Sequence, residues 1–218
     1  KELEPDEGVE VDLKITILKD NDFIEHQQSL GCGRHALNNL LMNEVFVKGD
    51  TTDSYKIPDV KDGKITYPVD PIPLLNVCKY ICDTCSYYLK EDLCDSVLEN
   101  YDNTVLFYAL GMLGFDIGEF IRGNKMPDNY NPDDYNQDGK QFIGYLVNQG
   151  ASHWTAIRKK DNKYYYVDSL KQVKKEYSVA DMRENLNYLY YPVFKTDKTV
   201  NRLLDTCQTE TGSTGEEE

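Results

Sequence analysis

Three residues that could together carry out nucleophilic catalysis lie far apart in this chain of 218 residues. Cys32 stands between two glycines at the start of a predicted helix, and His153 and Asp168 follow much later. A thiolate is the reactive form of cysteine, and the unpaired N–H groups at a helix N-terminus favour it. Because a histidine can serve as base and a carboxylate can orient that histidine, the set indicates a thiol protease.

The element that must hold Cys32 is a helix predicted over residues 32–43. Apolar residues recur along it at helical spacing and form a buried stripe: Ala36, Leu37, Leu40 and Leu41. His35 lies on the same helix, one turn along from Cys32, so we expect it to point along the helix rather than across a cleft. We therefore interpret His35 as a packing or supporting residue, and His153 as the base.

The element that must bring His153 to Asp168 is a hairpin, predicted from strands at 153–158 and 163–168 with a loop of four residues between them. If Arg158 lies opposite Lys163, antiparallel pairing places His153 directly across from Asp168. Side chains that face each other in this way have Cβ atoms roughly 4.5–5.5 Å apart, close enough for a hydrogen bond. The hairpin is thus predicted to build its own His–Asp pair.

The rest of the chain predicts an α+β fold in which an N-terminal helical part packs on an antiparallel sheet. Asn103 is the expected N-cap of one helix and Gly114 its stop. Residues 47–73 are rich in proline and glycine, so they form either a lid or binding element or a plain surface loop. Further strands are predicted at 11–19, 115–121, 141–147 and 192–196, and helices at 74–90, 92–99, 103–113 and 178–190.

Composition and charge narrow the class of protein. The formal net charge is −14, which argues against binding to nucleic acid phosphates and suits a basic partner. No apolar run is long enough to span a bilayer, and no secretory signal is visible, so we expect a protein of the cytoplasm or nucleus that does not bind membranes. We also expect it to be a monomer. We predict an acidic flexible segment at 1–10, a single catalytic domain at 11–205 and an acidic tail at 206–218.

Six cysteines would allow three disulfides in an oxidising compartment. Cys78, Cys82 and Cys85 recur at helical spacing with apolar residues, so we expect them to be reduced, small core residues of one helix. A zinc site through Cys82 and Cys85, with Cys78 or Cys94, is the alternative. Because no second Cys-x-x-Cys or His-x₃-His completes such a site, we expect no metal.

Around Cys32, His153 and Asp168 the chain resembles the Josephin family of papain-like ubiquitin proteases. The resemblance covers about residues 24–195, and residues 47–100, where the family has a mobile helical hairpin, follow it least. The family usually has Asn where this chain has Asp168, and both side chains can accept a hydrogen bond from imidazole. The matching residues are Gln27, the block Cys32-x-x-His35-x-Leu37-Asn38-Asn39-Leu40-Leu41, Ala109-Leu110 with Gly114, His153-Trp154, and Arg158-Lys159.

The resemblance implies a deubiquitinating enzyme that needs no cofactor and acts on ubiquitin, a ubiquitin-like protein or polyubiquitin chains. Cys32 would be the nucleophile, His153 the base and Asp168 its orienter, with Gln27 and the Cys32 backbone N–H as oxyanion donors. Gln28 is the alternative donor, and substrate binding is assigned to Gly31, Gly33 and Trp154. Two other readings stay open: a papain-like protease that processes its own precursor, and an inactive ubiquitin-binding module.

Overall fold

The computed structural model describes residues 10–11, 23–27, 30–49, 59–61, 64–66, 71–85, 93–95, 99–135, 139–150 and 153–196. The predictions for the acidic ends and for the strand at 11–19 therefore lie almost entirely outside the described residues. So does much of the loop predicted at 47–73, and Gln28 is also outside them.

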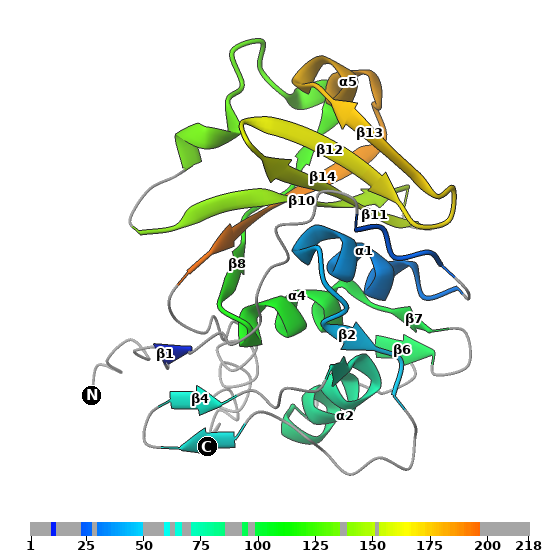
Figure 1. The fold of residues 1–218 in the computed structure, drawn as a ribbon, viewed down its shortest axis with the longest axis vertical. Helices are drawn as coiled ribbons and strands as arrows, with labels where there is room; N and C mark the ends of the chain where they lie inside the picture. The colour runs from blue at the N-terminus through cyan, green and yellow to red at the C-terminus, as the bar shows by residue number, and fades with distance from the viewer. Residues whose placement is uncertain are drawn as a thin grey trace, which may run out of the picture.

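A large sheet forms one half of the protein, and every strand pair in it is antiparallel. The strands run in the order β13-β12-β11-β10-β14-β8, with β9 pairing β14 beside β8 (Figure 1). Their bounds are β8 Phe115–Ile117, β9 Ile121–Arg122, β10 Gln141–Gln149, β11 Trp154–Lys160, β12 Lys163–Asp168, β13 Val173–Tyr177 and β14 Tyr188–Lys195. The mixed fold with a mostly antiparallel sheet agrees with the sequence-based prediction.

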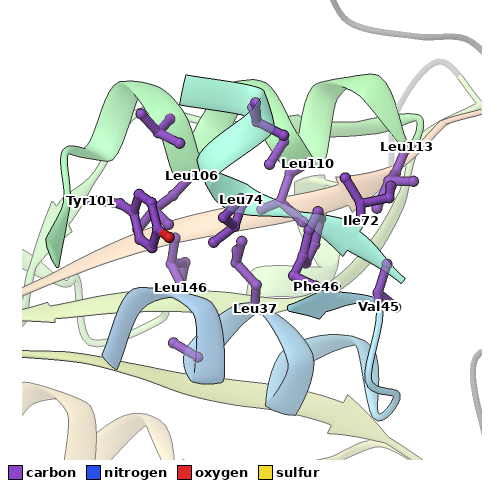
Figure 2. Packing of buried hydrophobic residues seen from close by; sticks show 14 of the residues in the cluster. Leu37, Val45, Phe46, Ile72, Leu74, Tyr101, Leu106, Leu110, Leu113 and Leu146 are labelled. Atoms are coloured by element: carbon purple, nitrogen blue, oxygen red, sulfur yellow. The ribbon is translucent and has the colours of Figure 1, made fainter. Parts of the chain in front are cut away.

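Helix α1 (Cys32–Leu41) lies between this sheet and the helical part that contains α2 (Leu74–Thr84) and α4 (Asn103–Met112), as Figure 1 shows. Its apolar side chains join one core with those of α2, α4 and β10 (Figure 2). Leu37, Leu106, Leu110 and Leu146 are each fully buried in it. Burial of this kind contributes roughly 1.5–3 kcal/mol for each large side chain, so the core holds α1 firmly against the sheet.

A second core lies on the other face of the sheet and is rich in tyrosine. Helix α5 (Val179–Glu184) contributes the buried Met182 to it, and Tyr145 and Tyr190 are fully buried there. The hydroxyl of Tyr190 donates to the Met182 carbonyl oxygen, so the polar end of this ring is satisfied. Both faces of the central strands are therefore covered, which makes the sheet a rigid support.

Short elements complete the described chain. β2 (Phe46–Val47) pairs in parallel with β5 (Ile72–Pro73), and β6 (Cys94–Asp95) pairs with β7 (Asn100–Tyr101). The amide of Asn38, on α1, both accepts from and donates to the backbone of Phe46, which ties β2 to the helix. The others are β1 Glu10–Val11, β3 Asp59–Lys61 and β4 Lys64–Thr66, with the 3₁₀ turns η1 Gly123–Lys125 and η2 Pro132–Tyr135.

Gly144 allows α1 to approach the sheet closely. It lies in β10 at φ +149°, where the register between β10 and β14 shifts. A Cβ atom at this position would come within 2.1 Å of the Ile157 carbonyl oxygen and 3.0 Å of Leu40 Cδ1. Only glycine tolerates both the backbone conformation and the contact, so the bulge and the helix packing depend on it.

Several predicted elements differ from the structure. The helix predicted at 74–90 ends at Thr84. Among the described residues of the helix predicted at 92–99, Leu93 is helical, but Cys94–Asp95 form β6 and Glu99 lies in the turn before β7. Asp102, not Asn103, caps α4, because its carboxylate accepts from Thr104 N. The helix predicted at 178–190 is the short α5, since the aromatic run before Pro192 pairs as β14. Strand β13 was not predicted, because a charged edge strand lacks apolar alternation.

The register predicted for the hairpin was wrong by two residues. Lys160 pairs with Lys163, and Ala156 pairs with Val167, so the loop has two residues, Asp161 and Asn162, rather than four. Both have positive φ, at 49° and 60°, as type I′ hairpin turns require. Continuing this register places Thr155, not His153, opposite Asp168. A shift of two residues leaves every side chain on its predicted face, which explains why the His–Asp pair survives.

The expectation of reduced cysteines was wrong for Cys78 and Cys85, whereas Cys82 is in no disulfide, as expected. Cys78 on α2 and Cys94 on β6 form a disulfide, with Cα atoms 6.6 Å apart, and Cys85 is disulfide-bonded as well. The helical spacing of Cys78 was recognised correctly, but spacing cannot show which residue of another element faces it. Because sulfur in a disulfide is no thiolate ligand, the alternative zinc site through Cys78 or Cys94 does not form. None of the helices in the described part of the chain has the length and apolar character that a membrane crossing needs.

Candidate active site

Cys32 is the first residue of α1, as predicted, and Gly31 is the N-cap. The Cys32 side chain is nearly buried, with 7% of the residue exposed, and its sulfur is in no disulfide. The Cys32 backbone N–H donates to the Leu30 carbonyl oxygen at 2.7 Å. To serve as an oxyanion donor, as predicted, this N–H must exchange that contact for the substrate oxygen. The helix start thus presents the thiol at the junction of α1 with the preceding segment.

His153 lies between Cys32 and Asp168. Its Nε2 atom is 3.0 Å from Asp168 Oδ1, and its ring also makes a side-chain hydrogen bond with Cys32. Since Nε2 faces the carboxylate, Nδ1 is the nitrogen left for the thiol. The hydrogen bonds to Asp168 and Cys32 raise the pKa of His153 from 6.5 to about 9, although burial alone would lower it. At neutral pH the ring is therefore an imidazolium.

Asp168 is fully buried at the end of β12. Its Oδ1 atom accepts from His153 Nε2 and from the backbone N–H groups of Leu170 and Lys171, at 3.0 and 3.2 Å. Its Oδ2 atom accepts from the Tyr166 hydroxyl at 3.1 Å, and Lys171 Nζ lies 3.4 Å away. Burial alone would raise the pKa of Asp168, but these hydrogen bonds outweigh it and hold the pKa well below its usual range. The carboxylate is charged at every physiological pH.

Gln27 is tied to the residue that follows Asp168. Its backbone N–H donates to the Ser169 carbonyl oxygen at 3.1 Å, and the buried Ser169 hydroxyl donates to Gln27 Oε1 at 3.3 Å. With its amide oxygen held by Ser169, Gln27 keeps Nε2 as the donor end of the side chain. The segment leading to Cys32 is thereby attached to the loop that follows Asp168.

A buried cluster of charges supports the start of α1. Arg34 Nε is 3.1 Å from Glu99 Oε2, and Arg34 Nη1 is 2.9 Å from Glu25 Oε1. His35 Nδ1 also lies 3.1 Å from Glu25 Oε1. The prediction that His35 supports the helix rather than acting as the base is consistent with this placement. The cluster joins the start of α1 to the segment just before it and to Glu99, which is 65 residues from Arg34 in the chain.

The residues assigned to substrate binding have internal contacts. A Cβ atom at Gly31 would come within 2.9 Å of Glu99 Oε2, and one at Gly33 within 3.0 Å of the Leu106 methyl groups. Trp154 is 7% exposed and packs edge-on to Phe107 and against Tyr191. These contacts explain both glycines and the tryptophan by packing. Their roles in substrate binding stay predictions.

Sequence reasoning missed the residues that surround the carboxylate. Tyr166 precedes Asp168 by two residues in a strand, so alternation places the two side chains on one face, but the hydrogen bond between them was not predicted. Gln149 at the end of β10 and Ser169 carried no such signal, because their contacts depend on strand order and loop geometry. Glu99 was missed for the same reason.

The chain was compared with protein families, solved structures and curated proteins. A model of the Josephin family matches residues 27–194, which include all four predicted catalytic and oxyanion residues. Among solved structures, a double glycine motif protease from an AMS/PCAT transporter, crystallised with the leader peptide, matches with 12% identity and a TM-score of 0.34. That match covers 79% of this chain and 90% of the other, and its TM-score is too low to support a functional comparison. A search of curated proteins finds no match.

Proposed function

Because the chain belongs to the Josephin family, we propose that it is a deubiquitinating thiol protease that uses Cys32, His153 and Asp168. The substrate is an amide or isopeptide bond after the C-terminus of ubiquitin or a ubiquitin-like protein. The observation that carries the proposal is the position of His153, which is hydrogen-bonded to the thiol on one side and to a buried carboxylate on the other. Nucleophile, base and orienter are thus assembled before substrate arrives.

The chemistry follows from the protonation state of His153. In the reactive form the proton of the Cys32 thiol has passed to His153, whose pKa is about 9, and once the thiolate has attacked the carbonyl carbon the ring gives that proton to the leaving amine. The neutral imidazole then accepts a proton from water, and the resulting hydroxide cleaves the thioester and releases the acid. His153 and Cys32 return to their starting states, so the cycle balances.

Asp168 and Gln27 support these steps in different ways. Asp168 holds the ring through Nε2, which keeps Nδ1 aimed at the sulfur during both proton transfers. Gln27 supplies its amide N–H to the oxyanion, and loss of one such donor typically costs about 2.7–4 kcal/mol in the barrier. The net charge of −14 suits an arginine-rich substrate tail, which is general support for a basic partner.

The test is labelling with a ubiquitin C-terminal electrophile. We expect the wild type to form one covalent adduct at Cys32 and the variant Cys32→Ala to form none. Cys82→Ala is the matched control, because Cys82 is the other cysteine of the described residues that is in no disulfide, and it lies on α2 rather than on α1, β11 or β12. Binding of ubiquitin without an adduct would instead favour a binding module, and self-cleavage of an extended precursor would favour a processing protease.

The predicted location in the cytoplasm or nucleus stays a proposal from the sequence. The Cys78–Cys94 disulfide opposes it, because disulfides persist mainly in oxidising compartments. Mass spectrometry of protein alkylated directly in cells decides the matter. Free thiols at Cys78 and Cys94 support a reducing compartment, and an intact bridge rules it out.

A further inference from the structure

The carboxylate that orients His153 has a neighbour to which the catalytic scheme assigns no role. The hydroxyl of Tyr166 donates to Asp168 Oδ2 at 3.1 Å, on the side of the carboxylate away from the bond to His153. In the described part of the chain, the cation near Oδ2 is Lys171 Nζ, at 3.4 Å on a side chain that is 61% exposed. Tyr166 therefore supplies the better ordered contact to this oxygen.

The direction of the Tyr166 hydroxyl is set by a second residue. Gln149 Nε2 donates to the Tyr166 oxygen at 2.6 Å and to Thr155 Oγ1 at 2.9 Å. A hydroxyl has a single proton, and an oxygen that accepts from an amide N–H keeps that proton for another partner. The proton of Tyr166 is thus directed to Asp168. Strand order produces the arrangement, because Gln149 is the last residue of β10 and Thr155 is the second residue of the neighbouring β11.

Two further features keep this arrangement fixed. The Tyr166 ring stacks on Tyr177 of β13, with centroids 5.2 Å apart and planes at 28°. Burial and the nearby charge of Asp168 raise the pKa of Tyr166, so its hydroxyl remains protonated throughout the working pH range. Ring and proton are both held in place.

We propose that Tyr166, oriented by Gln149, is a positioning residue that fixes the Asp168 carboxylate with Oδ1 aimed at His153. The inference rests on the proposed function, because it concerns the same His–Asp pair. Tyr166 does not touch the reacting atoms, and it acts through Asp168 and His153. Without its hydroxyl, the contact that Oδ2 keeps among the described residues is the long one to the exposed Lys171, and the carboxylate can rotate away from the ring.

The test is a double-mutant cycle with Tyr166→Phe and Asp168→Asn. Tyr166→Phe keeps the ring and its stack and removes only the hydroxyl. We expect kcat on a ubiquitin C-terminal amide to fall on the order of tenfold with KM unchanged, since a hydrogen bond to a charged group is lost away from the substrate. Asn can present its amide nitrogen, a donor, toward Tyr166, so the effect of Tyr166→Phe should be less than threefold in the Asp168→Asn background.

The control is Tyr164→Phe, on the same strand and face but next to Phe142 rather than Asp168. It should leave kcat within twofold of wild type, and melting temperatures of all variants measure any loss of fold. Equal losses from Tyr166→Phe in the Asp168 and Asn backgrounds would overturn the inference, because a purely structural role gives additive effects. So would an unchanged kcat in Tyr166→Phe.

The proposed function and this inference can fail separately. The same cycle is therefore also measured as the rate at which iodoacetamide alkylates Cys32, resolved from Cys82 by mass spectrometry. This reaction needs no ubiquitin, yet it depends on the His153 partner of the thiol. Absence of ubiquitin cleavage by the wild type refutes the function alone, and an additive alkylation cycle refutes the role of Tyr166.

Discussion

Replacing Asp168 by Asn separates the charge of this residue from its ability to accept a hydrogen bond. Asn keeps a carbonyl oxygen for His153 and for the two backbone N–H groups, and it is the residue that the family usually has here. The bonds of His153 raise its pKa from 6.5 to about 9, which corresponds to about 3 kcal/mol at 1.36 kcal/mol per pH unit. The hydrogen bond to Asp168 is the largest cause.

The expected change in the pKa of His153 follows from the kind of bond that Asn leaves. Hydrogen bonds to a charged acceptor are roughly twice as strong as neutral ones, so Asn should keep about half of the shift. We expect the alkaline limb of kcat/KM to move from about pH 9 in the wild type to about pH 8 in Asp168→Asn. At pH 7 the ring is still protonated, and kcat should fall less than about tenfold.

The assay is the pH profile of ubiquitin amide hydrolysis from pH 6 to 10, with Asp168→Ala measured beside Asp168→Asn. The Ala variant loses the acceptor altogether, so its kcat should fall by about 10²-fold or more through misplacement of the ring. An alkaline limb that stays at pH 9 in Asp168→Asn would refute the reasoning about charge. Near-normal activity of Asp168→Ala would remove Asp168 from the mechanism.

The remaining predictions concern stability. Arg34→Met should lower the free energy of unfolding by about 3–5 kcal/mol, because the buried Glu99, which is 4% exposed, would lose its closest cation. Urea unfolding measures this change, and a loss below about 1 kcal/mol would contradict the prediction. Replacing both Cys78 and Cys94 by Ala opens a loop of 16 residues and should cost about 3 kcal/mol under non-reducing conditions, whereas an unchanged melting temperature would show that the bridge is absent. Gly144→Ala should prevent folding or lower the melting temperature by more than 10 °C, because its Cβ meets backbone.

The pKa of His153 also bears on stability. A group whose pKa is raised on folding contributes stability below its unfolded pKa, here 6.5, and that stability is lost as the pH rises through about 9. The wild type should therefore lose stability between these values relative to His153→Gln. A constant difference between the two proteins from pH 6 to 10 would count against the charged His153–Asp168 pair.

The catalytic set itself was readable from the sequence, because its signals are local. Cys32 begins α1 where the glycines and the apolar stripe predict, and β12 has the predicted bounds, Lys163–Asp168. Strand alternation has a period of two, so the side-chain faces were correct although the register was not. The turn at Asp161 and Asn162 could have been anticipated, since both residues tolerate positive φ.

Only the tertiary structure decided the contacts between different helices, strands and loops, because the spacing of residues along the chain does not determine which elements meet. The Cys78–Cys94 bridge, the Arg34–Glu99 pair and the Gln149–Tyr166 bond each depend on which elements lie side by side. A residue's type and its spacing within one helix or strand determine which face it occupies. The partner across that face is chosen by the packing of the whole chain, and this is why the support of Cys32, His153 and Asp168 became visible only in three dimensions.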